Sequence, residues 1–443
     1  MNKEIHKKQN FFSFSDIDSE RKDRIMKFTS TEATPAPHVP PGVLRLTGAA
    51  KEDIPMYRIQ TMNKISPVGL NRFPSELYEV GDAVQDPQGI LVRSAKLLDL
   101  EFNPSLLAIA RAGVGVNNIP LDRCAAAGIP VFSTPGANAN AVKELVICAM
   151  LMGSRDIPGA IRWVREQAAS GVDVSTVVEK GKSAFIGPEL YKKTLGIIGL
   201  GAIGSIVANT AISLGMDVYG YDPFLSVDAA LRLDRHIHVV KDINELYKRA
   251  DYITIHIHYT KDTERMIDAK AIGAMKRGVR FINLARGEIV DDDAMLAALD
   301  TGWVAAYVTD FPNNRLVGAP HVLAMPHLGA STPESEQNCA VMAVDQLRDY
   351  LENGNIRNSV NLPAVSQERS GVCRLCLIHK NVPAMLASIT TLLSRDGINV
   401  ENLSNKSRGD YAYTIVDLSA PADQCVIDEV TALENVIRVR VIQ

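Results

Sequence analysis

The chain has 443 residues, of which 46% are hydrophobic and 22% are charged, and its formal net charge is -4. This length predicts about three domains with a sizeable core. The modest charge gives no indication of a nucleic acid or a membrane surface as a partner.

Residues 1–55 are polar, mix acidic with basic side chains and end in a proline-rich stretch. This composition is typical of a disordered extension and argues against a transit peptide. Because the first periodic strand follows Met56, translation could start at Met26 or Met56 instead of Met1. The six scattered cysteines predict no disulfide framework and favour a reducing compartment such as the cytoplasm.

Strands and helices alternate from residue 57 onward, which indicates an α/β domain. We expect strands at 57–62, 89–94, 106–111 and 129–133, a helix near 75–81 and a long helix at 138–153.

A glycine-rich turn then joins a strand at 194–199 to a helix at 202–214, and it reads Gly199-Leu200-Gly201-Ala202-Ile203-Gly204. In a βαβ unit the first glycine allows the tight turn, the second lets a pyrophosphate approach, and the third packs helix on strand. The next strand ends at Asp222, 23 residues after Gly199. A carboxylate there binds the adenosine ribose and repels a 2′-phosphate, so the pattern predicts NAD over NADP. The alternative is a glycine-rich loop in an unrelated fold.

Four further strands, expected at 251–257, 280–285, 305–310 and 321–326, predict a second doubly wound parallel sheet inserted into the first. Three of their carboxyl ends carry polar residues: Arg286, Asp310 and His327. Arginine can grip a carboxylate and histidine can take a hydroxyl proton, as oxidation of a 2-hydroxy acid requires. The alternatives are a surface salt bridge for Arg286 and a structural loop histidine for His327.

Specific motifs surround these residues: RAGVGVNNIP at 111–120, TPGANANAVKEL at 134–145, NLARGEIVD at 283–291 and PHLGASTPE at 326–334. With them, the sequence resembles the D-2-hydroxyacid dehydrogenases over about residues 56–443, and within them the members that act on 3-phospho-D-glycerate. The resemblance implies a Rossmann cofactor domain (136–327) inserted into a flavodoxin-like substrate domain (56–135 and 328–366). It also implies NAD-dependent oxidation of that acid to 3-phosphohydroxypyruvate, at the entry to serine biosynthesis.

The resemblance further implies roles for individual residues. His327 corresponds to the acid/base and Arg286 to the group that binds the substrate carboxylate. Cofactor contacts are expected from Val114, Gly199, Gly201, Ala202, Ile203, Gly204, Asp222, Ile257, Leu284, Ala285, Asp310, Gly329 and Ala330. Substrate contacts are expected from Arg93, Arg111, Gly113, Val114, Gly115 and Asn117, with structural ion pairs as the alternative for the two arginines.

One position departs from the family pattern, which places a glutamate five residues after the aspartate equivalent to Asp310. That glutamate orients the catalytic imidazole and raises its pKa. Here the position holds Arg315. If Arg315 faces His327, it should depress the imidazole pKa, and we expect activity with an altered pH profile. The alternatives are a dehydrogenase of another D-2-hydroxy acid and a catalytically weakened protein that senses NAD or amino acids.

Residues 372–443 predict the order βαββαβ and resemble an ACT domain, a regulatory module that binds amino acids between paired domains. His379, Asn381 and Asn399 match positions that hold L-serine in this family, whereas Ala384 replaces a common glycine. The alternative is a dimerising domain without a ligand. Either function makes a homo-oligomer, a dimer or a tetramer, the expected state.

Two other patterns carry weaker signals. Cys373 and Cys376 form a CxxC, but in a strand their odd separation sends the two side chains to opposite faces. The HxH pairs 236/238 and 256/258 lack a third ligand, so no metal site is predicted.

Overall fold

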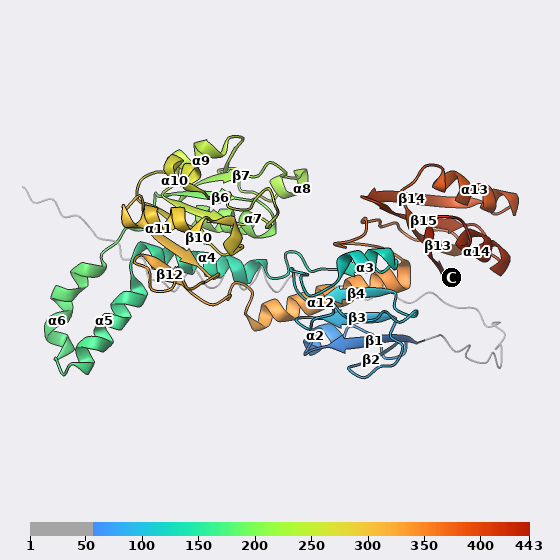
Figure 1. Cartoon of the computed structure of the whole chain (residues 1–443), viewed down its shortest axis with the longest axis horizontal. Helices are drawn as coiled ribbons and strands as arrows, with labels where there is room; N and C mark the ends of the chain where they lie inside the picture. Colours follow the sequence, from blue (N-terminus) through green and yellow to red (C-terminus); the bar gives the residue numbers. More distant parts are fainter. Residues whose placement is uncertain (1–55) are drawn as a thin grey trace, which may run out of the picture. The chain divides into compact units, whose positions relative to one another are not determined.

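A computed structural model describes residues 56–443, so the predicted extension at 1–55 lies outside the described residues. Figure 1 shows three β-sheets with their helices, and two of the three are entirely parallel. This confirms the predicted fold class, two doubly wound domains and a small antiparallel one. Among residues 56–443, no helix is both long and apolar enough to span a bilayer.

The first sheet has the strand order β2-β1-β3-β4-β5, the flavodoxin-like order that the resemblance implied. Its elements are β1 (Tyr57–Met62), α2 (Pro67–Leu70), β2 (Tyr78–Gly81), β3 (Gly89–Val92), β4 (Ala108–Arg111), α3 (Leu121–Ala126) and β5 (Val131–Phe132). The long helix α12 (Pro333–Asn353) comes much later in the chain and packs on α2, β3 and β4.

The helix expected near 75–81 is wrong, because this segment contains strand β2, which pairs in parallel with β1. Tyr78 is buried in the core between the sheet and α12, and its hydroxyl donates to Glu352 at 2.6 Å. Tertiary packing of one aromatic residue thus overrides the helix propensity of its neighbours.

The second sheet has the order β12-β11-β10-β9-β6-β7-β8, with the reversal of strand order next to β6 that is typical of a dinucleotide-binding fold. Its strands are β6 (Thr194–Ile198), β7 (Asp217–Tyr221), β8 (His238–Val240), β9 (Tyr252–Ile255), β10 (Val279–Asn283), β11 (Val304–Thr309) and β12 (Val322–Ala324). The helices are α4 (Ala139–Ser154), α7 (Ala202–Ser213), α8 (Val227–Ala230), α9 (Ile243–Arg249), α10 (Ala269–Ala274) and α11 (Asp292–Asp300), with the 3₁₀ turn η2 (Gly287–Ile289).

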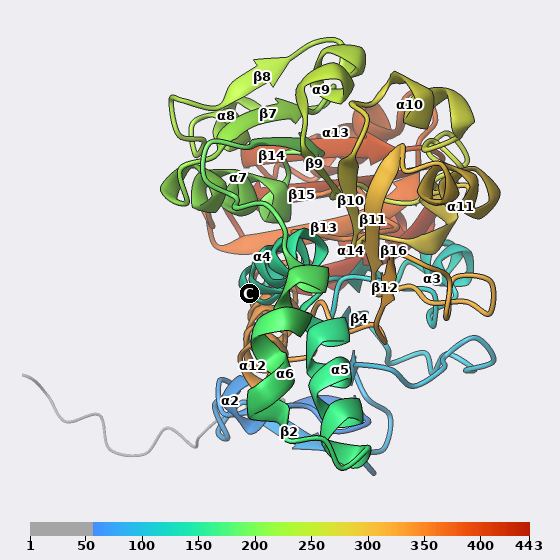
Figure 2. The same cartoon turned by 90° about the vertical axis from the view of Figure 1, so that its left-hand side faces the viewer.

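A helical hairpin between α4 and β6 was not predicted. It consists of α5 (Ile157–Ala169), α6 (Val174–Gly181) and the 3₁₀ turn η1 (Lys182–Phe185), which pack on one another (Figures 1 and 2). Aspartate side chains cap both helices: Asp156 accepts from the Gly159 amide at 2.9 Å and Asp173 from the Ser175 amide at 3.0 Å.

The third sheet is antiparallel, in the order β14-β15-β13-β16. Its elements follow the predicted order: β13 (Cys373–Lys380), α13 (Met385–Arg395), β14 (Val400–Arg408), β15 (Tyr411–Leu418), α14 (Gln424–Thr431) and β16 (Val436–Ile442). Cys373 packs in the core beneath α13 and α14, whereas Cys376 packs in the core around α12, so the two thiols lie on opposite faces as predicted.

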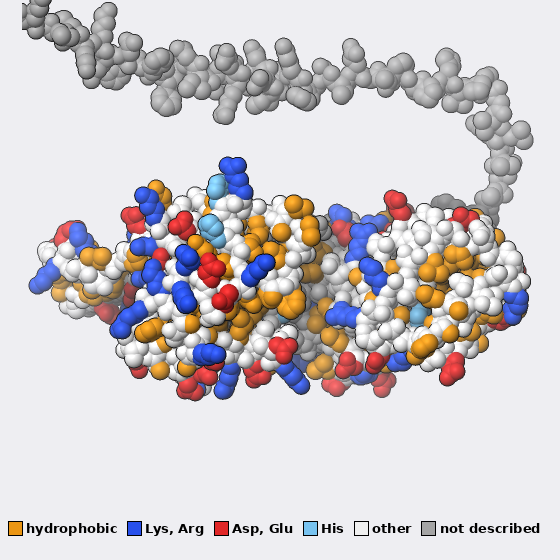
Figure 3. All heavy atoms as spheres, turned by 90° about the horizontal axis from the view of Figure 1, so that it is seen from above, with side chains coloured by type: hydrophobic (Ala, Val, Ile, Leu, Met, Phe, Trp, Pro, Cys, Tyr) orange, Lys and Arg blue, Asp and Glu red, His pale blue; other side chains and the backbone are white. Residues whose placement is uncertain are grey.

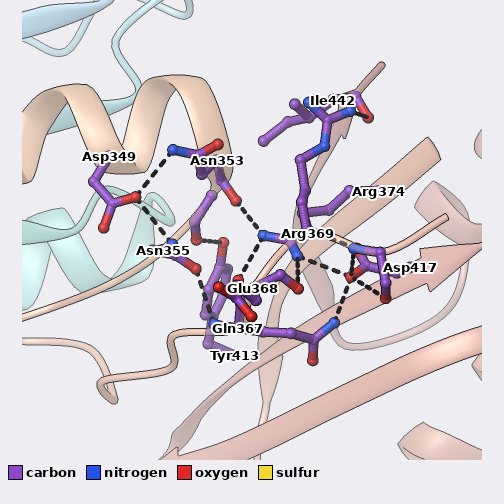
Figure 4. A network of polar contacts seen from close by, with 12 residues as sticks. Asp349, Asn353, Asn355, Gln367, Glu368, Arg369, Arg374, Tyr413, Asp417 and Ile442 are labelled. Atoms are coloured by element: carbon purple, nitrogen blue, oxygen red, sulfur yellow. Dashed lines mark hydrogen bonds and ion pairs between the residues drawn. The ribbon is translucent and has the colours of Figure 1, made fainter. Parts of the chain in front are cut away.

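A buried ion pair joins this third sheet to the segment that precedes it (Figure 4). The Arg374 guanidinium donates to both carboxylate oxygens of Asp417, at 2.6 and 2.8 Å, and both side chains are inaccessible to solvent. Arg374 also donates to the Asn353 carbonyl at the end of α12, at 2.7 Å, and Gln367 donates to Asp417 at 2.7 Å. These bonds connect α12, the segment around Gln367 that precedes β13, and strands β13 and β15.

Candidate active site

The three glycines of the 199–204 turn meet three different local requirements. Gly199 has φ +93°, and a Cβ on it would lie 2.5 Å from the His256 carbonyl oxygen. A Cβ on Gly204 would lie 1.9 Å from the Gly199 carbonyl oxygen, whereas a Cβ on Gly201 would meet nothing within 4 Å. The first and third glycines are therefore required by the protein's own backbone, and the second borders open space that a ligand can enter.

Helix α7 begins at Ala202, beside this open space, and Gly201 at its N-cap offers no capping side chain. The amides of its first turn, including Ala202 and Ile203, have no partner within the helix and favour an anion.

Asp222 follows β7 and lies beside the turn. Its carboxylate accepts from the Leu200 amide at 2.9 Å and from the Phe224 amide at 2.9 Å, and the side chain remains partly exposed. The two amides fix the carboxylate and leave further lone pairs for a ligand hydroxyl.

The other predicted cofactor-contacting residues follow neighbouring strands. Ile257 comes after β9, Leu284 and Ala285 are buried after β10, and Asp310 comes directly after β11. Carboxyl ends of parallel strands share one edge of a sheet, so these residues face the same side as the glycine turn. Gly329 and Ala330 lie in the loop between β12 and α12.

Asp310 is only 1% exposed, and its Oδ2 accepts from the Gly329 amide at 3.0 Å. Within the described residues its Oδ1 is buried and has no hydrogen-bond partner. Burial raises the pKa of Asp310. An unpartnered buried acceptor at this edge fits a ligand that brings its own N–H donor.

Guanidinium groups converge on the loop that follows β4. A Cβ on Gly115 would lie 3.4 Å from Nη2 of Arg286 and 3.8 Å from Nη1 of Arg111. The Nε of Arg111 donates to the Arg93 carbonyl at 3.0 Å, and the Arg93 side chain pairs with Glu336 of α12. Burial lowers the pKa of Arg111, and the charges of Arg286 and Arg93 lower it further. Such a cluster of like charges favours an anionic ligand.

The same loop supplies the remaining predicted substrate contacts. Gly113, Val114 and Gly115 are partly buried and Asn117 is exposed. The turn after β10 fixes the backbone of Arg286. In this turn the buried Asn283 donates to the Arg286 carbonyl at 2.9 Å and accepts from the Ala285 amide at 3.1 Å.

His327 is exposed, and the ring of Phe311 lies beside it. The centroids of the two rings are 4.7 Å apart, and the Cζ atom of Arg286 lies 5.6 Å from the same Phe311 ring centroid. Reasoning from the sequence missed Phe311. The available signal was its position, directly after Asp310 at the end of a central strand.

Arg315 does not pair with His327 as its sequence position suggested. Its guanidinium forms an ion pair with Asp293 in the first turn of α11, and both side chains are exposed. The Asn313 side chain accepts from the Arg315 amide at 3.0 Å, forming a local turn that leads the chain toward α11. Across residues 56–443, no carboxylate lies within ion-pair distance of the His327 ring.

The three residues expected to bind serine are not brought together within one chain. His379 is buried, with Nδ1 2.8 Å from the Lys380 carbonyl and Nε2 2.8 Å from the Thr414 hydroxyl. Asn381 lies at the same end of the sheet, where its side chain donates to the Gly409 carbonyl at 3.1 Å. Asn399 lies at the opposite end, because Val400 pairs with Leu418 whereas His379 pairs with Ala412.

The histidine pairs 236/238 and 256/258 do not extend into a larger ligand set. Within residues 56–443, no cluster of three or more histidine, cysteine or acidic residues is arranged to hold a metal ion.

Comparisons with known proteins agree with this arrangement. The family model for "D-isomer specific 2-hydroxyacid dehydrogenase, NAD binding domain" matches residues 147–329. A D-3-phosphoglycerate dehydrogenase of Synechocystis sp. is 34% identical over 326 residues, covering 72% of this chain and 56% of that protein. One from Haemophilus influenzae is 31% identical over 379 residues, covering 82% of this chain and 88% of that protein.

The chain spans 56%, 60% and 55% of the length of the relatives from Synechocystis sp., Bacillus subtilis and Methanocaldococcus jannaschii. Among solved structures, an NAD⁺-bound 3-phosphoglycerate dehydrogenase of Entamoeba histolytica is 26% identical, with a TM-score of 0.53, over 69% of this chain and 99% of that one. A D-mandelate dehydrogenase of Rhodotorula graminis, 21% identical, shares the fold with a TM-score of 0.59 over 70% of this chain and 99% of that one.

Proposed function

The chain belongs to the D-isomer specific 2-hydroxyacid dehydrogenases, and we propose that it oxidises 3-phospho-D-glycerate to 3-phosphohydroxypyruvate with NAD. The observation that carries this proposal is the convergence of the Arg111 and Arg286 guanidinium groups at Gly115. A substrate with both a carboxylate and a phosphate needs several cations, and Arg93, whose side chain is paired with Glu336, is a third guanidinium nearby.

NAD fits the residues present. The space beside Gly201 and the first turn of α7 suit the pyrophosphate, and Asp222 suits the adenosine ribose. The free Oδ1 of Asp310 suits the amide of the nicotinamide. When bound, NAD accepts the hydride from C2 of the substrate.

The chain's own residues then bind the acid and move its proton. Arg286 holds the substrate carboxylate with help from backbone amides of the loop that contains Gly113, Val114, Gly115 and Asn117, while Arg93 and Arg111 hold the phosphate end. His327 accepts the proton of the C2 hydroxyl. Because no carboxylate pairs with His327 within the described residues, a catalytically weakened NAD-binding protein is the second candidate.

Turnover with matched acids tests the proposal. The full chain is assayed by NADH formation from 3-phospho-D-glycerate, D-glycerate and D-2-hydroxyglutarate, each with NAD and with NADP. We expect 3-phospho-D-glycerate with NAD to react fastest, and His327→Gln to lower kcat roughly 100-fold or more. Preference for D-2-hydroxyglutarate would redirect the proposal to another acid. Tight NADH binding without turnover of any acid would favour the weakened protein.

L-serine is the effector that we propose for residues 372–443, with Asn381 of one copy and Asn399 of a second copy completing a site. Their separation within one chain supports a shared site. The buried His379 contributes by orienting the strand end, since both of its ring nitrogens already have partners. Adding L-serine to the same assay should inhibit the wild type and leave Asn381→Ala unaffected. Equal inhibition of both proteins would argue against this site.

A serine site shared between two copies of the chain requires a homo-oligomer, and the surface of the α5–α6 hairpin also supports one. Helices α5 and α6 contain no buried residue, and Ile157, Ile161 and Val164 are more than one third exposed. Figure 3 shows hydrophobic side chains on the surface of this hairpin, at the left of the view. An apolar helical surface of this kind is typical of a protein interface.

A further inference from the structure

Phe311 contacts both side chains that act on the substrate in the proposed reaction, His327 and Arg286. Its ring centroid lies 4.7 Å from that of the His327 imidazole, with an angle of 48° between the planes. The same ring centroid lies 5.6 Å from the Cζ atom of Arg286. Aromatic rings attract both a tilted imidazole and a nearby guanidinium. One side chain therefore packs against the proton acceptor and the carboxylate-binding group together.

Phe311 is itself held by the end of the second sheet. Its amide donates to the hydroxyl of Thr309 at 3.1 Å, and Thr309 is fully buried at the end of β11. On the other side, a Cβ on Gly287 would lie 3.4 Å from the Cβ of Phe311, so η2 packs closely against it. The ring is partly buried. It is thus a fixed surface, unlike a side chain at the tip of a loop.

Other neighbours give His327 little support. Arg315 is paired with Asp293, away from the imidazole. Asp310 interacts electrostatically with His327, but it forms no ion pair with the imidazole, and its Oδ2 already accepts from the Gly329 amide. Arg286 also lies against Phe311, and as a cation it offers the imidazole no attractive partner. Packing against Phe311 is therefore the contact that can fix the orientation of the ring.

We propose that Phe311 is a positioning residue, which holds the Arg286 guanidinium and the His327 imidazole at a fixed separation. With that spacing one hydroxy acid can be gripped by its carboxylate and deprotonated at its hydroxyl at the same time. This inference rests on the proposed function. It also explains how the site works with an arginine in place of the family glutamate, because an aromatic surface provides the orientation that the carboxylate provides elsewhere.

The kinetic test compares Phe311→Leu, which keeps much of the volume but removes the ring, with Phe311→Tyr, which keeps the ring. Arg315→Ala is the matched control four residues along the same loop. Misplacing reacting groups slows chemistry, so we expect Phe311→Leu to lower kcat about 10-fold to 100-fold. Its NADH affinity, measured by fluorescence, should be unchanged. Phe311→Tyr should recover most of the activity, and Arg315→Ala should retain it.

An isotope effect separates positioning from a loss of folded protein. With 3-phospho-D-glycerate deuterated at C2, the primary isotope effect on kcat should rise in Phe311→Leu because hydride transfer becomes slower than product release. A lower fraction of folded enzyme reduces kcat without changing the isotope effect. Unchanged kcat and isotope effect in Phe311→Leu would overturn the proposal.

A measurement without turnover distinguishes failure of this inference from failure of the proposed function. In the NMR spectrum of the free protein, the ring protons of His327, assigned by their loss in His327→Gln, should carry a ring-current shift. Phe311→Leu should abolish that shift and Arg315→Ala should preserve it. If the wild type oxidises no acid but the shift behaves in this way, the contact stands and the substrate assignment fails. If Phe311→Leu leaves the shift unchanged, the positioning role fails whatever the substrate is.

Discussion

Arg111 and Asp310 are charged residues held largely away from water with no ion-pair partner among the described residues. Burial lowers the pKa of Arg111 and raises that of Asp310, so the charged form of each is held at a cost in free energy. Charged groups with pKa values shifted by burial cluster at functional sites. A bound anion at Arg111 and an amide donor at Asp310 would each offset this cost, which links the electrostatics of the site to its proposed ligands.

His379 gives a pH-dependent stability that a variant can test. Burial lowers its pKa, so below about pH 6.5 the unfolded chain binds a proton that the folded domain does not. The stability present above that pH should therefore be lost as the pH falls, by at most about 1.4 kcal/mol per pH unit. Urea unfolding of the wild type and of His379→Gln at about pH 7.5 and about pH 5.5 measures this difference.

In that experiment, His379→Gln should show the smaller loss between the two pH values. His258→Gln, which replaces an exposed histidine, is the control and should follow the wild type. Parallel losses in all three proteins would assign the pH dependence to other groups.

Most strands of the two parallel sheets could be predicted because they are largely apolar runs followed by a polar residue, whereas the short edge strand β8 was not predicted. Parallel strands bring those ends to one edge, so the sequence alone predicted that Asp222, Arg286 and Asp310 lie on the same edge of the sheet. Strand β2 could not be predicted, because it depends on Tyr78 packing against a helix more than 250 residues away in the chain.

Loop paths and strand register account for the other differences. Arg315 follows a turn made by the Asn313 side chain, which directs it toward Asp293 and away from His327. Asn399 is separated from His379 by the antiparallel register, which spacing along the sequence does not reveal. The contacts of Phe311 likewise need three loops to be placed together.

Arginine side chains of the third sheet donate to carbonyls in the last turn of helix α12. Arg440 donates to the carbonyls of Tyr350 and Leu351 at 3.0 and 2.9 Å, and Arg374 donates to that of Asn353 at 2.7 Å. Cations at a helix C-terminus satisfy carbonyls that the helix leaves free. Arg374→Met should cost about 3–5 kcal/mol, because Asp417 would remain buried and unpaired.

Urea unfolding measures this cost, and two further variants interpret it. Adding Asp417→Leu to Arg374→Met should recover much of the loss, since no buried charge then remains. The exposed pair of Arg395 with Glu429 provides the matched control, and Arg395→Met should cost about 1 kcal/mol or less. If both single variants lowered the free energy of unfolding by the same amount, the buried pair would have no special role in stabilising the segment between α12 and β13.

At the scale of the whole molecule, the hairpin of α5 and α6 packs on itself, and neither helix contains a buried residue. A groove of about 640 Å³ runs along it, lined by apolar residues that include Ile161, Trp163, Val164 and Phe185, together with the charged Arg155, Asp156, Arg165 and Lys182. Acidic and basic side chains are interspersed elsewhere on the face drawn in Figure 3. A second copy of the chain, with its own hairpin, presents the same apolar surface and so fits a symmetric contact.

Ile161→Glu tests that contact, because Ile161 is half exposed at 50% on the hairpin and a charge there would be desolvated in an interface. We expect sedimentation velocity to show a dimer or larger for the wild type and a shift toward the monomer for Ile161→Glu. Leu231→Glu changes an equally apolar residue that is 79% exposed outside the hairpin, and it should sediment like the wild type. A monomeric wild type would rule out the interface, and loss of association in Leu231→Glu alone would place it elsewhere. The serine proposal would weaken with the first outcome, since a site shared between Asn381 and Asn399 needs two chains.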